Sequence, residues 1–560
     1  MRVTWLEQHG TSYHEAVYLP SFSSDRAYRD ACRPPPVPRP SGAQTLDPLV
    51  AIANHTIFGG CSADQVAKQP GTALANSPIE PFIAADPKRP GVLLTGVQQD
   101  RWTNGGSRGL RGGVSGDGGK HWYLSLPSGI SQCTGGVFPR ATDPWVTYGP
   151  DGAAYFFSLA FVELVDPNAN GRSAMLVSKS TDAGLTWGRP TTLIDDTDPL
   201  FFNDKNSITA DPYRPGYVYA VWDRLAGPPS AFVAPGGSDE NASSANAARA
   251  AIAHDGLARA RAHLAKNRAN AANAAVPAVP DTFGPTYYSR TTDGGKTWER
   301  ASPIYDPGQG AQTIGNLIQV LPNGDVLDFF TNIDAAGNLD IGYVRSTDKG
   351  FSFERTQHVV ATMNGYGAIT PDAKTPIRDA SILFSVSTNR VSGKVVVTWQ
   401  DTRLDPTNVL NRVFYTESND AAATFSTPVR IDKTPANAAT PLRTQAFNPT
   451  IVAADDGTLA VTYYDFRHDT SAAGQELADT WAIFCKPTAT ASCTNAASWG
   501  HELRLTPKSF NLADAPLVTA GLFLGDYFGL ATQGKSIWPA FVTATGKQQT
   551  TLWTRRIALP

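Results

Sequence analysis

Ionisable and amide side chains stand at the starts of several apolar runs of this 560-residue chain, and their identity changes from one run to the next. They are Glu80, Arg140 with Asp143, Asn203-Asp204-Lys205, Arg378-Asp379, Asn448 and Asp526-Tyr527. Two carboxyl groups that share a pocket can divide the roles of acid and base between them. Glu80, Asp143, Asp204 and Asp526 are therefore candidates for a carboxylate pair that cleaves a glycosidic bond.

A second set of charged residues closes the apolar run that follows. It consists of Asp100-Arg101, Asp223-Arg224, Asp401 with Arg403, and Asp465 with Arg467. One interpretation is a network of salt bridges between neighbouring structural units. The other is a ring of arginines that binds an acidic or polyhydroxylated sugar, because a guanidinium group can hold a carboxylate through two parallel bonds.

The elements that position these residues are indicated by a repeated octapeptide of the type Ser-x-Asp-x-Gly-x-Thr-Trp, called a box below. Five variants occur, at 115–122, 180–187, 291–298, 346–353 and, with three alanines after the aspartate, 418–425. Each predicts a tight hairpin, since the aspartate can accept bonds from the N–H groups of its own turn and the glycine supplies a positive φ. Five copies in one chain indicate a repeated structural unit.

Short β-type runs occur between the boxes and continue in the same rhythm after the last one. A unit without a box covers 450–467, and a further one from 526 to about 555 shows three evident strands. A propeller can close when one terminus adds a strand to the unit of the other, and 49–53 is a suitable donor. The sequence therefore predicts an all-β fold, a single β-propeller with seven blades favoured and six blades plus an appended piece as the alternative.

The predicted domain organisation is one propeller over residues 76–560. Residues 1–75 form an irregular N-terminal segment with a proline-rich stretch at 33–40, and part of this segment closes the ring. An insertion at 228–282, within the third blade, is rich in alanine and is predicted to be helical. It is interpreted as a solvated arm, with a lid or dimer contact as the alternative.

The boxes and the strand pattern resemble the Asp-box (BNR) repeat sialidase-like propellers over most of residues 76–558. This resemblance implies that the box aspartates are structural and lie on the face opposite the ligand funnel. It also implies three arginines that clamp a substrate carboxylate, with Arg140 and Arg378 as two members, and a tyrosine nucleophile beside a carboxylate, for which Tyr527 next to Asp526 is well placed. Replacing Asp526 by Asn, or Tyr527 by Phe, is then expected to abolish turnover with little change in melting temperature.

Two parts of the sialidase pattern differ in this chain. The first blade begins Ile79-Glu80-Pro81 where the family has an Arg-Ile-Pro type motif, and 102–109 carries no carboxylate where the acid is expected. These differences favour a sialidase-like glycoside hydrolase of another specificity. Boxes of this type also occur in propellers that only bind, so a non-catalytic carbohydrate- or protein-binding propeller stays the alternative.

The predicted site residues follow from both lines of reasoning. Catalytic roles are predicted for Tyr527, Asp526, Glu80 and Asp204. Substrate binding is predicted for Arg140, Asp143, Lys205, Arg378, Asp379, Arg101, Arg224, Arg403 and Arg467.

No cofactor and no metal are predicted. Residues 166–171 open like a calcium loop, but Val177 stands where the loop needs a bidentate glutamate, and an ordinary turn is favoured. A net charge of -3 without a basic stripe predicts neither a nucleic-acid nor a membrane partner. The expected partner is a glycan or another small acidic or polyhydroxylated ligand.

Cysteine spacing and the N-terminus bear on the compartment. Cys485 and Cys493 flank a short polar loop and are predicted to form a disulfide, and Cys32, Cys61 and Cys133 allow one more pair. The first residues lack the apolar core of a secretory signal. The protein is therefore expected to be secreted or periplasmic if a signal has been removed, and cytoplasmic otherwise.

Overall fold

The computed structural model describes residues 46–61, 69–162, 172–198, 200–226, 283–437, 439–470, 472 and 474–560. The predicted helical insertion at 228–282, the proline-rich stretch, the calcium-like loop and Cys32 lie outside these residues. Within the described part of the chain, no helix is long and apolar enough to cross a bilayer.

The strands form successive antiparallel groups along the chain. The first two are β2 (Ile79–Ala85), β3 (Leu93–Arg101), β4 (Ser107–Ser115) and β5 (Tyr123–Ser125), then β6 (Arg140–Tyr148), β7 (Ala154–Val162), β8 (Arg172–Ser180) and β9 (Thr191–Asp196). The next two are β10 (Phe201–Ala210), β11 (Val218–Ala226), β12 (Thr286–Thr291) and β13 (Ser302–Tyr305), then β14 (Gln312–Val320), β15 (Val326–Ile333), β16 (Leu339–Ser346) and β17 (His358–Met363). These are followed by β19 (Phe384–Thr388), β20 (Val395–Asp401), β21 (Arg412–Ser418) and β22 (Val429–Arg430), then β23 (Ala446–Ala453), β24 (Leu459–Asp465), β25 (Leu477–Cys485) and β26 (Gly500–Arg504).

A last sheet joins the two ends of the described chain. It orders β30 (Gly529–Gln533), β31 (Ser536–Gly546), β32 (Gln549–Thr554) and β1 (Val50–Ala53), with β1 antiparallel to β32 at the outer edge. The remaining short elements are β18 (Ile377–Arg378), β27 (Phe510–Asn511), β28 (Leu517–Val518), β29 (Gly521–Phe523), β33 (Ile557–Ala558) and the 3-10 helices η1 (Gln132–Thr134), η2 (Pro441–Thr444), η3 (Ala496–Ser498) and η4 (Leu512–Asp514).

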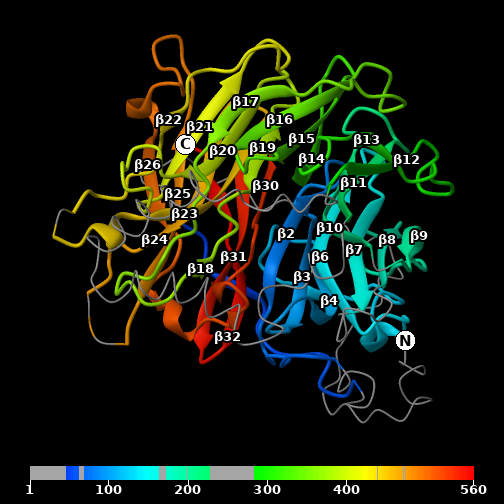
Figure 1. The fold of residues 1–560 in the computed structure, drawn as a ribbon, viewed down its shortest axis with the longest axis horizontal. Helices are drawn as coiled ribbons and strands as arrows, with labels where there is room; N and C mark the ends of the chain where they lie inside the picture. The colour runs from blue at the N-terminus through cyan, green and yellow to red at the C-terminus, as the bar shows by residue number, and fades with distance from the viewer. Residues whose placement is uncertain are drawn as a thin grey trace.

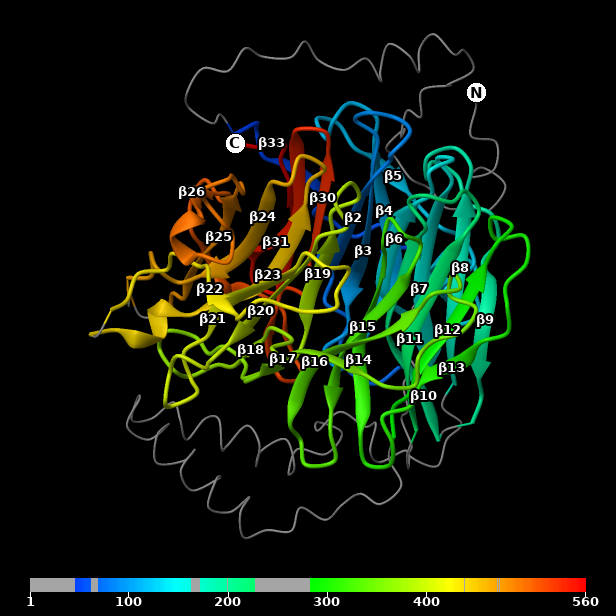
Figure 2. The ribbon, with the colours of Figure 1, turned by 90° about the horizontal axis from the view of Figure 1, so that it is seen from above.

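The sheets follow one another around a ring, as the colour sequence in Figure 1 shows. The first strand of each group packs against the first strand of the next, in the order β2, β6, β10, β14, β19, β23 and β30, and β30 packs against β2. Figure 2 gives the same ring after a 90° turn. The fold is thus all-β, with multiple four-stranded antiparallel sheets arranged as propeller blades.

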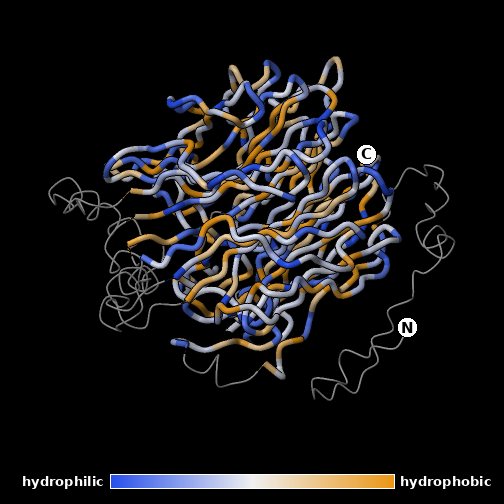
Figure 3. The backbone as a smooth tube through the Cα atoms, turned by 90° about the vertical axis from the view of Figure 1, so that its right-hand side faces the viewer, coloured by the Kyte–Doolittle hydropathy of each residue, from blue (hydrophilic) through white to orange (hydrophobic). Residues whose placement is uncertain are grey.

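Burial on both faces explains the composition of the middle strands. All nine residues of β3 and all seven of β20 and β24 are buried, because each sheet is covered by a neighbour on either side. Apolar residues can therefore stand side by side in such strands, as Val395, Val396 and Val397 do in β20, rather than in strict alternation. Figure 3 shows these hydrophobic stretches through the interior, with hydrophilic colour concentrated toward the loops.

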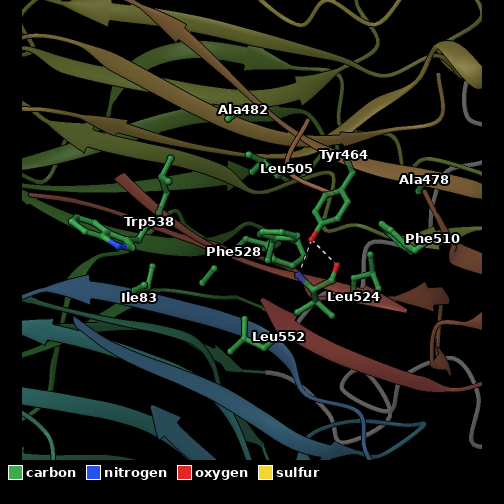
Figure 4. Packing of buried hydrophobic residues seen from close by; sticks show 14 of the residues in the cluster. Ile83, Tyr464, Ala478, Ala482, Leu505, Phe510, Leu524, Phe528, Trp538 and Leu552 are labelled. Carbon is green, nitrogen blue, oxygen red and sulfur yellow. Dashed lines mark hydrogen bonds between the residues drawn. The ribbon is translucent and has the colours of Figure 1, made fainter. Parts of the chain in front are cut away.

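Neighbouring sheets are also joined by hydroxyl groups. Ser207 on β10 donates to the carbonyl oxygen of Asn316 on β14 at 2.7 Å, and Ser385 on β19 accepts from the backbone N–H of Ile451 on β23 at 3.1 Å. Tyr464 on β24 both donates to the carbonyl oxygen of Val542 on β31 and accepts from its N–H, at 2.9 and 3.0 Å. Figure 4 draws these two bonds inside the packed apolar cluster between the sheets.

The five boxes form turns between the third and outer strands of their groups, as predicted. In the second box, Ser180 donates to Asp182 at 2.7 Å and accepts from the N–H of Gly184, and Asp182 accepts from the N–H and the hydroxyl of Thr186. The fifth box makes the same bonds around Asp420 although Ala421 and Ala422 stand in its turn, with φ of 57° and 67°.

Two disulfides are present among the described residues. The predicted bond between Cys485 and Cys493 is confirmed, and Cys61 pairs with Cys133. The second bond ties the segment after β1 to the loop between β5 and β6.

Candidate functional site

Most innermost strands break their pairing register close to the strand start, at the end of the ring opposite the boxes. A residue with positive φ stands at each of these breaks: Glu80, Asp143, Lys205, Gly315 and Asn448, with φ between 44° and 72° (49°, for example, at Asn448). Such a conformation costs a non-glycine residue about 1–2 kcal/mol. Bulges of this kind redirect side chains and are frequent next to functional sites.

Proline fits this local structure. Pro81, Pro144 and Pro449 follow directly on Glu80, Asp143 and Asn448. Because proline has no N–H to donate, it is tolerated at edge strands and bulges, where the ladder bond is missing. The bulges therefore carry a sequence signal, an ionisable or amide residue followed by proline at the start of an apolar run.

Four predicted carboxylates converge on Lys205. Its ammonium group contacts Asp526 at 2.5 Å and lies 3.7 Å from Oε1 of Glu80. Its backbone N–H donates to Asp143 at 3.2 Å and to Asp204 at 2.9 Å. Residues separated by more than 400 positions in the chain thus form one buried charge cluster, since the side chains of Glu80 and Asp526 are only 1% and 4% exposed.

Arg378 completes the cluster from a different element. Its guanidinium group donates from Nε and Nη2 to the two oxygens of Asp526, at 3.0 and 2.6 Å. It is placed by β18, which pairs in parallel with β29 so that Arg378 lies opposite Phe523. The guanidinium groups of Arg378 and Arg101 lie over the ring of Phe523, with their central carbon atoms 4.6 and 5.0 Å from the ring centroid.

The carboxyl groups of the cluster differ in their tendency to ionise. Burial raises the pKa of Glu80 to about 8, in spite of the opposing charge of Lys205. Burial, with the charge of Asp143, raises the pKa of Asp204 to about 6. For Asp526 burial acts in the same direction, but Arg378 and Lys205 outweigh it and hold the pKa well below its ordinary value.

Asp379 is a further carboxyl group at this place. Its Oδ2 accepts from the N–H of Ala368 and from the amide of Gln400, both at 2.7 Å. Burial raises its pKa to about 6, partly offset by these two bonds. Gln400 in turn accepts from the N–H of Asn448, so its amide links Asp379 to the start of β23.

Tyr527 makes no hydrogen bond to a carboxylate among the described residues. Its hydroxyl donates to the carbonyl oxygen of Pro144 at 3.4 Å, and its ring lies 5.3 Å from that of Trp145. Burial, followed by the charges of Asp143, Glu80 and Asp526, raises the pKa of the phenol well above its ordinary value. The nucleophilic role expected for Tyr527 therefore stays a prediction.

A cavity of about 330 Å³ runs along the innermost strands. Asp379, Asp526 and Tyr527 lie in its wall at the charged end, and Arg390 lies in its wall among residues of the box-facing part of the strands. Lys205 borders a small adjoining recess of about 30 Å³. Glu80, Asp143 and Asp204 are not part of either wall and stand behind Asp526 and Lys205.

Four of the predicted binding arginines lie away from this cluster. Arg140 donates to the carbonyl oxygens of Pro70 and Gly105 at 2.5 and 2.6 Å and so holds loops in place. Arg224, Arg403 and Arg467 form ion pairs with Asp196, Asp401 and Asp465, at 2.7, 2.6 and 2.5 Å.

The recurrent acid–arginine pairs follow neither proposed pattern throughout. Asp401 with Arg403 and Asp465 with Arg467 are ion pairs within one blade. Asp223 accepts instead from the N–H of Gly315 and from Asn316 in the next blade, and Asp100 accepts from Thr56 and the N–H of Asn76. Two of the four predicted pairs thus form ion pairs, whereas Asp100 and Asp223 bind other partners than the arginine next to them.

Sequence reasoning missed Trp145, which lies in the walls of both the cavity and the recess. It stacks on Phe82, with ring centroids 3.7 Å apart. A signal was present, because both aromatic residues stand two positions after a bulge residue, Asp143 and Glu80. Among the described residues, no cluster of histidine, cysteine or acidic side chains is arranged to hold a metal ion.

No family model and no curated protein matches the chain. Solved structures do, among them a protein of unknown function from Dyadobacter fermentans DSM 18053, with 12% identity, a TM-score of 0.42 and coverage of 92% of this chain and 99% of that one. The Hadza microbial sialidase Hz136 follows, with 13% identity, a TM-score of 0.41 and coverage of 83% and 76%.

The GH93 alpha-L-arabinofuranosidase of Fusarium graminearum, solved with arabinobiose, has 9% identity, a TM-score of 0.38 and coverage of 92% and 98%. Sialidases and GH93 arabinofuranosidases are thus among the structural neighbours. Identity and TM-scores are low, so the roles of residues in this chain rest on its own geometry.

Proposed function

We propose that the protein is a glycoside hydrolase that cleaves a sugar residue from a glycan at the charged end of the central cavity. The observation that carries this proposal is the pair of carboxyl groups in the wall there, Asp379 and Asp526, whose surroundings separate their pKa values in opposite directions. Such pairs supply the acid and the ionised partner that glycoside cleavage requires.

The two carboxyl groups take different roles. Asp526 stays ionised beside Arg378 and Lys205 and stabilises the positive charge that develops on the sugar, or attacks it. Asp379 holds its proton to higher pH, and the bonds from Ala368 and Gln400 both end on Oδ2, so Oδ1 is the oxygen proposed to carry the proton toward the leaving group. Glu80 and Asp204 support the cluster from behind, and Tyr527 is the alternative nucleophile.

The test is a screen of aryl glycosides and acidic polysaccharides with the unmodified protein and Asp379→Asn. We expect Asp379→Asn to lower kcat/KM by about 100-fold or more on substrates with poor leaving groups, as is usual for loss of a proton donor. A dinitrophenyl leaving group needs no proton, so on such a substrate most of the activity should remain. Asp455→Asn, which removes an exposed carboxylate that pairs with Arg390, is the control.

Equal loss of activity on both kinds of substrate would remove Asp379 as the proton donor. Absence of turnover on the whole panel would contradict the hydrolase proposal.

One observation favours the second candidate, a non-catalytic carbohydrate- or protein-binding propeller: Lys205 and Arg378 are already paired with acids, and the hydroxyl of Tyr527 contacts a carbonyl group. In that case ligand binding persists without turnover and weakens in Arg378→Ala.

The ring is proposed to have seven blades. The succession of seven innermost strands, from β2 to β30, supports this count, and an experimental structure would distinguish it from six blades with an appended sheet.

We also propose that the protein acts outside the reducing cytoplasm, because two disulfides suit an oxidising compartment. Fractionation of the native host would test this location.

A further inference from the structure

Trp145 gives the cavity a rigid aromatic wall next to the carboxyl groups. It lies on β6 two positions after Asp143, and its ring is held by contacts with Phe82, stacked at 3.7 Å, and Tyr527, tilted at 5.3 Å. The side chain is half-buried, so part of its surface faces the space that Asp379 and Asp526 also border. An apolar wall with a few polar groups beside it is the usual composition of a small-molecule site.

The size and polarity of this site suit one end of a carbohydrate. A volume of about 330 Å³ lies at the lower end of ligand pockets, which favours a small unit over a long chain segment. A sugar ring presents C–H groups on one face and hydroxyl groups around its edge. The first can pack on an aromatic ring, and the second can bond to the carboxyl oxygens and to the amide of Gln400.

The charges at this end decide which sugars fit. The charged residues of the cavity wall here are Asp379 and Asp526, both acidic. Lys205, in the adjoining recess, is bonded to Asp526 at 2.5 Å, and Arg378 is bonded to both oxygens of the same carboxylate. A ligand carboxylate would thus lie beside the carboxyl groups of Asp379 and Asp526, while Lys205 and Arg378 already bind Asp526.

An arginine clamp is not assembled from the other predicted members. Arg140 is completely buried and bonded to carbonyl oxygens of its own neighbourhood, and Arg224 is paired with Asp196. Arg101 is 3% exposed and lies against Phe523, outside the walls of the cavity and the recess. Like charges placed together weaken binding strongly.

We infer that the site takes a neutral sugar, with the apolar face of its ring on Trp145, and discriminates against sugars that carry a carboxylate. This inference rests on the proposed function and narrows its substrate class. It departs from the sequence expectation that an acidic ligand was as suitable as a polyhydroxylated one.

The test is isothermal titration calorimetry of the full chain with matched pairs of sugars: glucose with glucuronic acid, and galactose with galacturonic acid. Arabinobiose and N-acetylneuraminic acid extend the neutral and acidic arms. At pH 7 we expect the tightest neutral sugar to bind at least about tenfold more tightly than its acidic counterpart. In Asp379→Asn, which removes one of the two negative charges, the ratio should shrink.

The aromatic contact is tested by Trp145→Ala beside Trp298→Phe, which alters a half-buried tryptophan of the third box at the far end of the blade. Trp145→Ala should weaken binding of the neutral sugar by about tenfold, whereas Trp298→Phe should leave it unchanged. Trp145→Phe keeps an aromatic ring and should recover part of the affinity, which shows that the site itself remains folded.

The inference is overturned if acidic members bind as tightly as neutral ones, if no neutral sugar of the panel binds, or if the Trp145 and Trp298 variants behave alike. Its failure can be told apart from failure of the proposed function. Neutral sugar bound on Trp145 without turnover of any glycoside removes only the hydrolase. Turnover of an acidic glycoside keeps the hydrolase and removes the neutral-sugar inference.

Discussion

Asp526 carries an unusual share of the electrostatic balance of this protein. Its two oxygens face Arg378 and Lys205 in surroundings where only 4% of its side chain is exposed. The sequence alone led us to expect that Asp526→Asn would leave the melting temperature nearly unchanged. The ion pairs change that expectation, because Lys205 and Arg378, whose side chains are 11% and 28% exposed, would lose their nearest acidic partner.

We predict that Asp526→Asn lowers the free energy of unfolding by about 3 kcal/mol, the usual cost of breaking a buried ion pair. Denaturant-induced unfolding at pH 7 measures this quantity. The matched control is Asp195→Asn, which breaks the exposed pair with Arg172 and should cost less than about 1 kcal/mol. Equal effects of the two variants would mean that the cluster does not hold the fold.

Glu80 should give the stability of the protein a recognisable pH dependence. Burial raises its pKa from 4.5 to about 8, so the folded state holds the proton more tightly than the unfolded state does. The stabilising contribution of this proton is fully present below pH 4.5 and is lost as the pH rises toward 8.

Glu80→Gln removes this titration while keeping the shape of the side chain. The variant should therefore gain stability relative to the unmodified protein as the pH rises from 5 to about 8. Unfolding free energies of both proteins across this range provide the measurement. A difference that stays constant with pH would show that Glu80 ionises normally.

Among strands and turns, the boxes show how one hydrogen-bonding pattern survives changes of sequence. Ser418 and Asp420 make the same contacts as the intact boxes, although the turn between them and Thr424 contains no glycine. Alanine is strained at positive φ, whereas glycine is not. We predict that Ala421→Gly stabilises the protein by about 0.5 kcal/mol after the larger entropy of the unfolded glycine chain is counted. Thermal unfolding measures this change in stability. A loss of stability in Ala421→Gly would contradict the claim that alanine is strained at this position.

The box aspartates should also give an acid-sensitive contribution to stability. Hydrogen bonds from Ser352 and Ser346 overcome burial and lower the pKa of Asp348 to about 2. Its contribution is fully present above the ordinary value of about 4 and is lost as the pH falls through 2. Asp348→Asn should therefore be less stable than the unmodified protein at pH 6, and the difference should vanish toward pH 2. A difference unchanged at low pH would contradict this.

The strands that could be recognised from sequence were those with a local signal. The boxes gave the blades and the face on which the turns lie, and 450–467 was recognised as a unit by its apolar rhythm although it has no box. The short parallel pairing of β18 with β29 has no such local signal. It joins Arg378 to Phe523, and two sheets of the ring lie between these residues in the sequence.

The candidate site was predictable to a similar degree. Glu80, Asp143, Asp204, Lys205 and Asp526 were selected because they stand at strand starts, and the ring does bring them together. Arg140 was selected by the same rule but is used for loop contacts, since the direction of a long side chain depends on neighbours distant in sequence. Asp379 was predicted to bind substrate, and only its bonds to Ala368 and Gln400 point to a role as proton donor.

For the ring taken together, closure depends on the strand contributed by the N-terminal segment. β1 covers β32, and the side chains of Ile52 and Ala53 are buried in the same cluster as the strands β30 to β32. A chain that starts at residue 55 should lose several kcal/mol of stability, because burial of Ile52 alone contributes about 1.5–3 kcal/mol. A chain that starts at residue 46 is the control.

The measurement is the midpoint and steepness of denaturant unfolding. We expect the shorter chain to unfold earlier and in a broader transition, since the exposed edge of β32 allows the last sheet to open by itself. Identical curves for the two chains would show that the ring closes without β1.

The bulges also bear on how new activities can be built on this scaffold. Gly315 occupies the same kind of position as Glu80 and Lys205 but offers no side chain, and a Cβ placed there would meet mainly the flexible end of Leu383. Its φ of 72° is one that asparagine and aspartate tolerate better than other residues. Gly315→Asn or Gly315→Asp is therefore a natural starting point for redesigning which ligands the protein accepts, because it would add a functional group to the rim while leaving every existing one in place.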